Sequence, residues 1–233
     1  MNERAYRKRE YWENQNVATF PGEGPYGIPR MLPCTQLEVE RWIGFNFALS
    51  CPPERRRFTG VHFWVDDAQF KRVWTYPRRY RDLLLQFGAV TSPEFSVFET
   101  FPVALRLYNQ YRNAWLARFW AEAGINVVPS VVWTEGWDRE ALWETYPVGS
   151  ILALSTVGCM RTDADRAWME RGIAEMQRRL RPVQVLLHGK RPEGLTGPVS
   201  EIPPVTEMIR QRVSGSSRLF EGNRTGTGGT GQS

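Results

Sequence analysis

The sequence predicts an α/β domain with a mainly parallel sheet. From residue 60 onward, short runs of β-branched or aromatic residues alternate with longer helical patterns, as they do in βαβ units. The strand runs are apolar almost throughout, which is typical of parallel strands covered by helices on both faces. These observations leave two arrangements open: a small or incomplete (β/α) barrel, and an open doubly wound sheet.

The first 40 residues are expected to form an N-terminal helix and a Pro- and Gly-rich arm. Residues 1–20 are polar, with a few aromatic residues among charges, and predict a short helix that packs on the body. The run from Pro21 to Pro33 is rich in Pro and Gly and predicts a loop. Residues 41–47 are expected to form a first strand, which begins an α/β domain that spans residues 41–213.

Five further runs predict the core strands. We expect these strands at residues 61–65, 88–92, 126–133, 150–155 and 183–188. A weaker strand is expected at 198–202 and a short helix at 205–213. From Ser214 the chain is mostly Ser, Gly, Thr and Arg, so residues 214–233 are expected to be a disordered tail.

Helical patterns separate the strands, and local signals mark their ends. The expected helices cover residues 76–86, 97–123, 138–145 and 162–180. Ser96 and Glu99 fit a capping box at the start of the second helix, and Thr162 or Asp163 can cap the last. Gly124 is suited to end the long helix as a C′ glycine.

Composition is ordinary for a globular protein in water. Hydrophobic residues make up 42% of the chain and charged residues 24%. The longest apolar runs are far shorter than the roughly 20 residues that cross a bilayer. The basic N-terminus is not followed by the apolar segment of a secretory signal. We therefore expect a cytoplasmic protein that does not associate with membranes.

Several common site motifs are absent. The chain has no Walker-type loop, no HExxH, no GxSxG and no GxGxxG between a strand and a helix. Three cysteines without a CxxC and two histidines make a disulfide framework or a structural zinc site unexpected. A divalent metal bound by oxygen ligands remains open, with Asp66, Asp67 and Glu94 as its ligands.

The charge is basic, and almost all of it is arginine. The net charge is +5, and all but three of the 30 basic residues are arginine. Arginine is suited to phosphate forks and base stacking, which would indicate a nucleotide or nucleic-acid partner. Alternatively, a GC-rich genome favours arginine codons. The clusters at 55–57 and 78–81 are short and interrupted, unlike the long basic stripe of most nucleic-acid-binding proteins.

Polar residues follow the predicted strands, at the edge where α/β sheets and barrels form their sites. Asp66 and Asp67 follow one strand and Glu94 follows the next, while Thr156 and His188 come at the ends of later strands. Carboxylates there can act as acid, base or metal ligand. The structural alternatives are a helix N-cap for Asp66 and a first-turn acid for Glu94.

Other candidate residues also have two interpretations. Asn109 and Arg112 lie three residues apart in the long helix, and a buried guanidinium needs an anionic partner. That partner is either one of the strand-end carboxylates Glu94 and Asp66, or a substrate phosphate or carboxylate. Cys159 is a nucleophile or a small packing thiol. Three roles are open for His188: a general base, a metal ligand and part of a polar turn.

A set of short motifs occurs in order between Phe63 and Gly189. These motifs are Phe63-Trp64-Val65-Asp66-Asp67, Ser92-Pro93-Glu94-Phe95-Ser96, Asn109-Gln110-Tyr111-Arg112, Gly124-Ile125-Asn126-Val127-Val128-Pro129, Thr156-Val157-Gly158-Cys159 and His188-Gly189. The set resembles the domain of unknown function 4417 family, found in bacteria, prophages and phages. The family pattern has Asp where this chain has Glu94, and often Tyr where it has His188. The resemblance implies a phage or mobile-element context and no established activity.

The sequence therefore supports two functions. The first is an enzyme that acts on an anionic nucleotide or nucleic-acid substrate at the strand ends. Asp66 and Glu94 would be its catalytic groups. Its expected substrate-binding residues are Asn109, Arg112, Thr156 and His188. The alternative is a non-catalytic interaction or nucleic-acid-binding protein of phage or plasmid biology, in which the same residues form a structural network. No particular protein partner is indicated.

Overall fold

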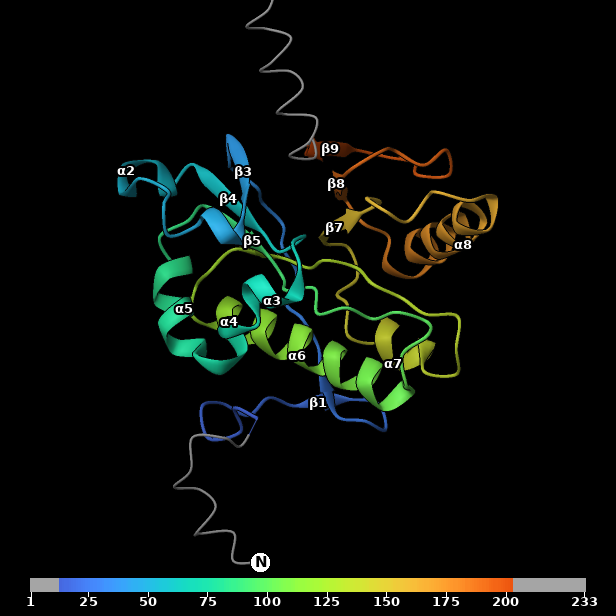
Figure 1. The fold of residues 1–233 in the computed structure, drawn as a ribbon, viewed down its shortest axis with the longest axis horizontal. Coiled ribbons are helices and arrows are strands. Elements are labelled where there is room, and N and C mark those ends of the chain that lie inside the picture. Colours follow the sequence, from blue (N-terminus) through green and yellow to red (C-terminus); the bar gives the residue numbers. More distant parts are fainter. Residues whose placement is uncertain (1–12, 203–233) are drawn as a thin grey trace, which may run out of the picture.

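A computed structural model describes residues 13–202 of the chain (Figure 1). The expected helix at 205–213 and the tail at 214–233 lie outside these residues. Within the expected N-terminal helix, residues 13–17 form turns instead. Glu13 and Asn14 have positive φ angles of 45° and 64°, which a right-handed helix does not accommodate.

The core strands form two parallel sheets, so the expected α/β class is confirmed. The first sheet contains, in spatial order, β3 (Arg41–Gly44), β4 (Thr59–His62), β5 (Ala89–Thr91) and β6 (Val127–Val128). The second contains β7 (Ile151–Ser155), β8 (Gln184–His188) and β9 (Val199–Ile202). Every neighbouring pair in both sheets is parallel. A short antiparallel ribbon of β1 (Gly22–Glu23) and β2 (Ile28–Pro29) lies within the expected loop.

In both sheets the strands lie side by side in the same order as in the chain, without a reversal. A doubly wound sheet requires such a reversal, so the described strands do not form one. A parallel bridge between Ser130 and Ala153 links the two sheets after β6. A closed barrel is not confirmed, because β3 and β9 do not pair with each other in the described part. A small apolar cluster joins both sheets: it contains Val128 of the first sheet, Ile151, Ala153, Leu186 and Ile202 of the second, and Cys34 from the segment before β3.

Helices pack around the sheets (Figure 1). The longer ones are α5 (Pro77–Leu84), α6 (Val103–Glu122) and α8 (Asp163–Leu180). The shorter ones are η1 (Phe45–Phe47), α2 (Pro53–Arg56), α3 (Asp67–Phe70), α4 (Arg72–Thr75) and α7 (Arg139–Trp143). The main core lies between these helices and the strands, and Trp115 and Trp120 of α6 are fully buried in it. None of the helices in residues 13–202 is long and apolar enough to cross a bilayer.

The long helix begins later than the sequence predicted. Helix α6 begins at Val103, and the expected capping box at Ser96 does not form. Pro102 precedes the first helical residue and disfavours helical geometry at the residue before it. The other end signals are confirmed. Thr162 forms a capping box with Asp165, and Gly124 ends α6 with a φ of 89°.

The expected first strand at 41–47 ends at Gly44, and η1 follows it. Strands β4 and β6 also end earlier than expected, and this shapes the site. Strand β6 stops at Val128, because Pro129 has no N–H to continue the ladder. Strand β4 stops at His62, and the N–H of Phe63 donates to the hydroxyl of Thr91 instead of to a strand carbonyl. The residues after both strands therefore leave the sheet.

Candidate functional site

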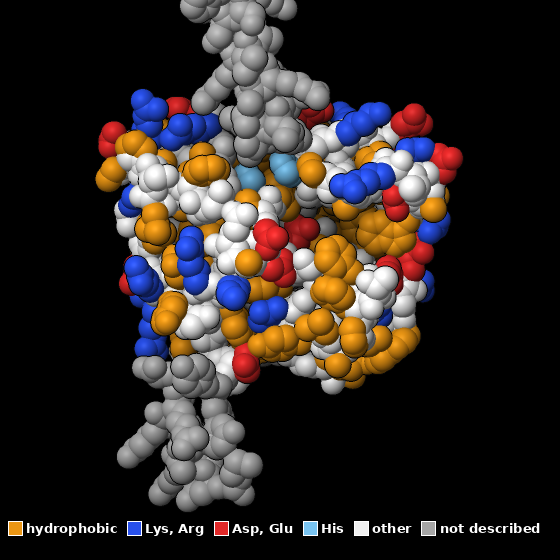
Figure 2. Space-filling model, in the orientation of Figure 1, with side chains coloured by type: hydrophobic (Ala, Val, Ile, Leu, Met, Phe, Trp, Pro, Cys, Tyr) orange, Lys and Arg blue, Asp and Glu red, His pale blue; other side chains and the backbone are white. Residues whose placement is uncertain are grey.

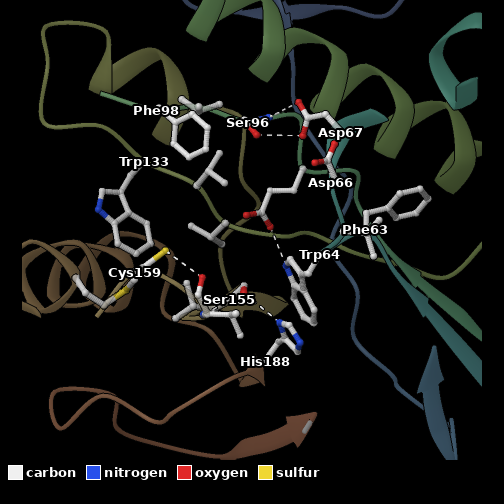
Figure 3. Close-up of a pocket in the computed structure, with 18 of the residues that line it drawn as sticks. Phe63, Trp64, Asp66, Asp67, Ser96, Phe98, Trp133, Ser155, Cys159 and His188 are labelled. Carbon is white, nitrogen blue, oxygen red and sulfur yellow. Dashed lines mark hydrogen bonds between the residues drawn. The ribbon is translucent and has the colours of Figure 1, made fainter. Parts of the chain in front are cut away.

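A cavity of about 690 Å³ lies at the carboxyl ends of the parallel strands (Figure 3). Its walls come from the segments that follow β4, β5 and β6 and from the ends of β7 and β8. Of the sequence-predicted site residues, Asp66, Asp67, Glu94 and His188 line this cavity. The other three, Asn109, Arg112 and Thr156, are not among its lining residues.

Glu94 has the most distinctive environment in the cavity. Its Oε2 accepts hydrogen bonds from Nε1 of Trp64 at 2.8 Å and from the hydroxyl of Ser130 at 2.6 Å. Its Oε1 accepts no hydrogen bond from another described residue. The carboxyl group is thus oriented by one oxygen, while the other is available to a bound molecule.

Burial raises the pKa of Glu94 to about 7. The two hydrogen bonds lower the pKa because they favour the ionised form, and the negative charge of Asp67 raises it. Burial outweighs the hydrogen bonds. Near neutral pH both forms of the carboxyl group are populated, as a general acid–base catalyst requires.

Asp66 and Asp67 line the cavity but also bind the protein. Asp66 is the N-cap of α3, and its carboxylate accepts the N–H of Ala68 at 2.9 Å, as the structural interpretation predicted. Asp67 accepts the N–H of Ser96 at 3.1 Å and its hydroxyl at 3.0 Å (Figure 3). Within residues 13–202, no group of three or more His, Cys, Asp or Glu side chains is arranged to bind a metal ion.

His188 lies in a stack of three aromatic rings. Its ring is parallel to that of Trp64, with 4.8 Å between centroids and 6° between planes (Figure 3). His62 stacks on both, at 5.2 Å from Trp64 and 5.3 Å from His188. The hydroxyl of Ser155 lies 3.1 Å from Nδ1 of His188. Burial lowers the pKa of His188 to about 4, so this ring is neutral at physiological pH.

The remaining walls are mostly apolar. The largest apolar lining residues are Phe63, Phe98, Phe101, Trp133, Trp168 and Met169. The rings of Trp133 and Trp168 stack with 4.8 Å between centroids. Among residues 13–202, no Lys or Arg lines the cavity. The described walls therefore combine aromatic side chains and carboxyl groups.

Asn109 and Arg112 of α6 contact the cavity wall formed by the segment after β5. Asn109 donates to the carbonyl of Ser96 at 2.6 Å and accepts from Arg112. The guanidinium of Arg112 lies over the rings of Phe95, at 3.7 Å from its centroid, and Tyr108. The ion pair expected with Glu94 or Asp66 is not formed. The ion pair is absent because α6 places the guanidinium of Arg112 against the rings of Phe95 and Tyr108.

Thr156 and Cys159 follow β7. The hydroxyl of Thr156 donates to the carbonyl of Lys190 at 2.8 Å, so it joins β7 to the segment after β8. Cys159 lines the cavity. Burial raises the pKa of its thiol, which favours the packing interpretation over that of a nucleophile.

Sequence reasoning missed Ser130 and Trp64 as residues of the site. Ser130 is the one polar side chain in the apolar run from Val127 to Val132, and this was a usable signal. Trp64 gave no such signal, because an aromatic residue in a strand pattern usually belongs to the core. Its indole N–H becomes significant only when Glu94 is seen beside it.

Comparisons with known proteins identify the family. The family model described as Domain of unknown function (DUF4417) matches residues 20–202. The chain belongs to this family. The match confirms the resemblance found in the sequence, and it includes every residue that lines the cavity of this DUF4417 protein.

Two phage proteins are similar to this DUF4417 protein. The Gene 1 protein of Mycobacterium phage D29 is 29% identical over 224 residues, which cover 89% of this chain and 81% of the relative. The Gene 1 protein of Mycobacterium phage L5 is 28% identical over 172 residues, which cover 74% and 75%. No solved structure matches the chain. The relatives support the expected phage context.

Proposed function

We propose that this DUF4417 protein is an enzyme in which Glu94 exchanges a proton with a nucleotide whose base lies in the cavity. The state of Glu94 carries the proposal: a pKa of about 7, one oxygen bound by Trp64 and Ser130, and the other without a partner among residues 13–202. General acid–base catalysis needs this combination of orientation and pKa. The proposed reaction takes place in the cytoplasm.

The walls of the cavity favour a nucleobase as the bound part of the substrate. Its volume of about 690 Å³ lies within the ~300–1,000 Å³ typical of small-molecule sites. A nucleobase has apolar faces for aromatic walls and a polar edge for Glu94. The phosphates would stay outside, because the described part of the chain lines the cavity with three carboxyl groups and no cation. This modifies the anionic-substrate hypothesis: the anionic part is not what the cavity binds.

The supporting residues have defined parts in this proposal. Asp67 and Asn109 both bind Ser96 and so position the wall that contains Glu94. His188 presents a neutral ring beside Trp64. An anion clamp by Arg112 remains a prediction without a contact in the cavity, and so does a divalent metal at Asp66, Asp67 and Glu94.

A ligand panel tests the proposal. Thermal unfolding is measured with nucleosides and nucleotides, each with and without Mg²⁺ or Mn²⁺, at pH 6 and pH 8. A ligand that binds the folded state raises Tm by mass action. We expect a stabilising ligand whose effect differs between the two pH values in the native protein and not in Glu94→Gln. Glu122→Gln, which changes an exposed carboxylate paired with Arg118, is the matched control.

Catalysis is tested on the same ligand. The stabilising nucleotide is incubated with the native protein, Glu94→Gln and Glu122→Gln, and products are detected by mass spectrometry. Product from the native protein and the control, but not from Glu94→Gln, is the expected result. Absence of any stabilising ligand, or equal product from Glu94→Gln, would contradict the proposal.

A non-catalytic binding protein is the second candidate. The hydrogen bonds of Asp67 and Asn109 to Ser96 favour it, because they give these polar residues a structural role. Under this alternative a ligand still raises Tm, but no product forms with any variant.

A further inference from the structure

The positive charge of the chain is concentrated in one segment. Residues 53–86 contain eight basic and four acidic residues, so this segment accounts for +4 of the net charge of +5. Its basic residues are Arg55, Arg56, Arg57, Lys71, Arg72, Arg78, Arg79 and Arg81. Residues 135–202, by contrast, contain nine basic and ten acidic residues. The excess charge is therefore not spread evenly over the surface.

The two regions also differ in how their arginines are paired. On the α7–α8 side, five of the nine basic residues form ion pairs with neighbouring carboxylates, namely Arg139, Arg166, Arg171, Arg178 and Arg179. The other four, Arg161, Arg181, Lys190 and Arg191, form none with a described residue. In the segment 53–86, five exposed cations form no ion pair with a described residue, and these are Arg55, Arg57, Lys71, Arg78 and Arg79. Unneutralised like charges on one face favour an anionic partner.

The fold brings the two basic clusters onto one face. Arg56 at the end of α2 donates to Gln86, just after α5, at 2.6 Å. The guanidinium of Arg72 in α4 lies over the ring of Tyr80 in α5 at 5.8 Å from its centroid. Helix α2 therefore lies near the C-terminal end of α5, and α4 lies beside α5 (Figure 1). Lys and Arg side chains lie along this side of the molecule, whereas basic and acidic side chains alternate near α8 (Figure 2).

Exposed aromatic rings lie among these cations. Phe58 follows α2 and is 40% exposed, and Tyr76 between α4 and α5 is 57% exposed. The guanidinium of Arg57 lies over the ring of Phe58, at 4.6 Å from its centroid. Basic side chains that follow a phosphate backbone, together with aromatic rings on which bases stack, are the combination that binds single-stranded nucleic acid.

We infer that the α2–α4–α5 face binds single-stranded nucleic acid, with its five exposed cations at the phosphates and with Phe58 and Tyr76 at the bases. None of these seven residues lines the cavity of Glu94. The inference therefore stands independently of the proposed enzyme function.

Fluorescence anisotropy with a labelled oligodeoxythymidylate of about 20 nucleotides tests the inference. Binding is measured against KCl concentration for the native protein and for two quadruple variants. The test variant is Arg55→Gln, Arg57→Gln, Arg78→Gln and Arg79→Gln. The matched control removes four exposed charges from the α7–α8 side: Arg139→Gln, Arg166→Gln, Arg171→Gln and Arg178→Gln. Thermal unfolding verifies that both variants are folded.

The electrostatic part has a quantitative expectation. For single strands, the slope of log affinity against log salt changes by about 0.7 for each phosphate contact. The test variant should lose up to about 2.8 of slope, while the control variant keeps the native slope. An equal loss in both variants would show a general effect of charge and overturn the inference.

The aromatic part is tested with Phe58→Ala and Tyr76→Ala. Each should weaken binding about fivefold or more while the salt slope stays native, because stacking is not ionic. Glu94→Gln should bind the oligonucleotide as the native protein does, which separates this surface from the cavity. Failure of the native protein to bind at low salt, or tighter binding to duplex of the same length, would overturn the inference.

Discussion

At the scale of single residues, one carboxyl group determines the chemistry of the candidate site. Glu94 is raised to a pKa of about 7 by burial, although Trp64 and Ser130 donate hydrogen bonds that favour its ionised form. The same residue would be an ordinary ionised surface acid if it lay in water. Its usefulness as acid or base is therefore a property of its surroundings.

Removal of a hydrogen bond should raise this pKa further. In Ser130→Ala the ionised form of Glu94 loses one donor, so its pKa should rise by about one pH unit, since a hydrogen bond to a charged group contributes about 1.5 kcal/mol. The carboxyl resonance of Glu94 in an NMR titration measures the change. Ser155→Ala, which removes the hydroxyl beside His188, is the control. A lower or unaltered pKa in Ser130→Ala would refute this account.

The raised pKa also predicts how stability depends on pH. Because the pKa of Glu94 rises from 4.5 to about 7 on folding, its contribution is present below pH 4.5 and is lost as pH rises to about 7. Glu94→Gln removes this loss. Relative to the native protein, the variant should gain on the order of 2 kcal/mol between pH 4.5 and pH 7.5. Urea unfolding at several pH values measures the difference, and a difference independent of pH would contradict the prediction.

At the scale of elements, the ends of strands and helices shape the site. Pro102 delays α6, so the residues between β5 and α6 remain outside regular structure and form a wall of the cavity. Pro129 ends β6, so the residues after that strand leave the sheet and line the cavity as well. Asn113 of α6 accepts the N–H of Phe95 at 2.8 Å and so holds this wall to the helix. The polar residues Asn109 and Asn113 of α6 thus have a structural part, because both side chains bind backbone groups of the wall.

The buried ion pair between Arg106 of α6 and Asp138 is expected to make the largest contribution of α6 to stability. Arg106 donates from Nε at 2.8 Å and from Nη2 at 2.6 Å to Asp138, and the two side chains are only 6% and 0% exposed. Arg106→Met leaves a buried carboxylate without its partner and should cost about 3–5 kcal/mol. Urea unfolding measures this cost.

The double variant tests the reason for that cost. Replacing Asp138 by Leu in the Arg106→Met background removes the unpaired charge, so it should recover much of the lost stability. Arg118→Met, which breaks an exposed pair with Glu122, is the control and should cost less than about 1 kcal/mol. A loss below 1 kcal/mol in Arg106→Met itself would refute the assignment.

At the scale of the whole molecule, convergence of strand ends creates the cavity. The two parallel sheets follow each other in chain order, so the segments after β4, β5 and β6 and the ends of β7 and β8 meet at one edge. The positions of Asp66, Asp67, Glu94 and His188 after strands were predictable from sequence, whereas their convergence on one cavity is seen only in the structure. Parallel strands necessarily place their carboxyl ends together.

Other predictions failed where they depended on packing. The sequence favoured an ion pair for Arg112, but the buried pair in the described residues involves Arg106. Periodicity gives the face of a helix on which a residue lies, and not the element that this face meets. Asn109 and Thr156 were predicted to bind substrate, yet neither lines the cavity, and each donates to a backbone carbonyl instead.

The sequence by itself determined the α/β class, the parallel strands and the strand-end position of the carboxylates, because hydrophobic periodicity and turn residues act locally. The order of the strands in the sheets was decided by the tertiary structure. Only the tertiary structure decided which groups meet. Trp64 and Ser130 are 66 residues apart in sequence yet bind one carboxyl oxygen. The two basic clusters share one face for the same reason. Burial, which raises the pKa of Glu94, depends on neighbours that are distant in the chain.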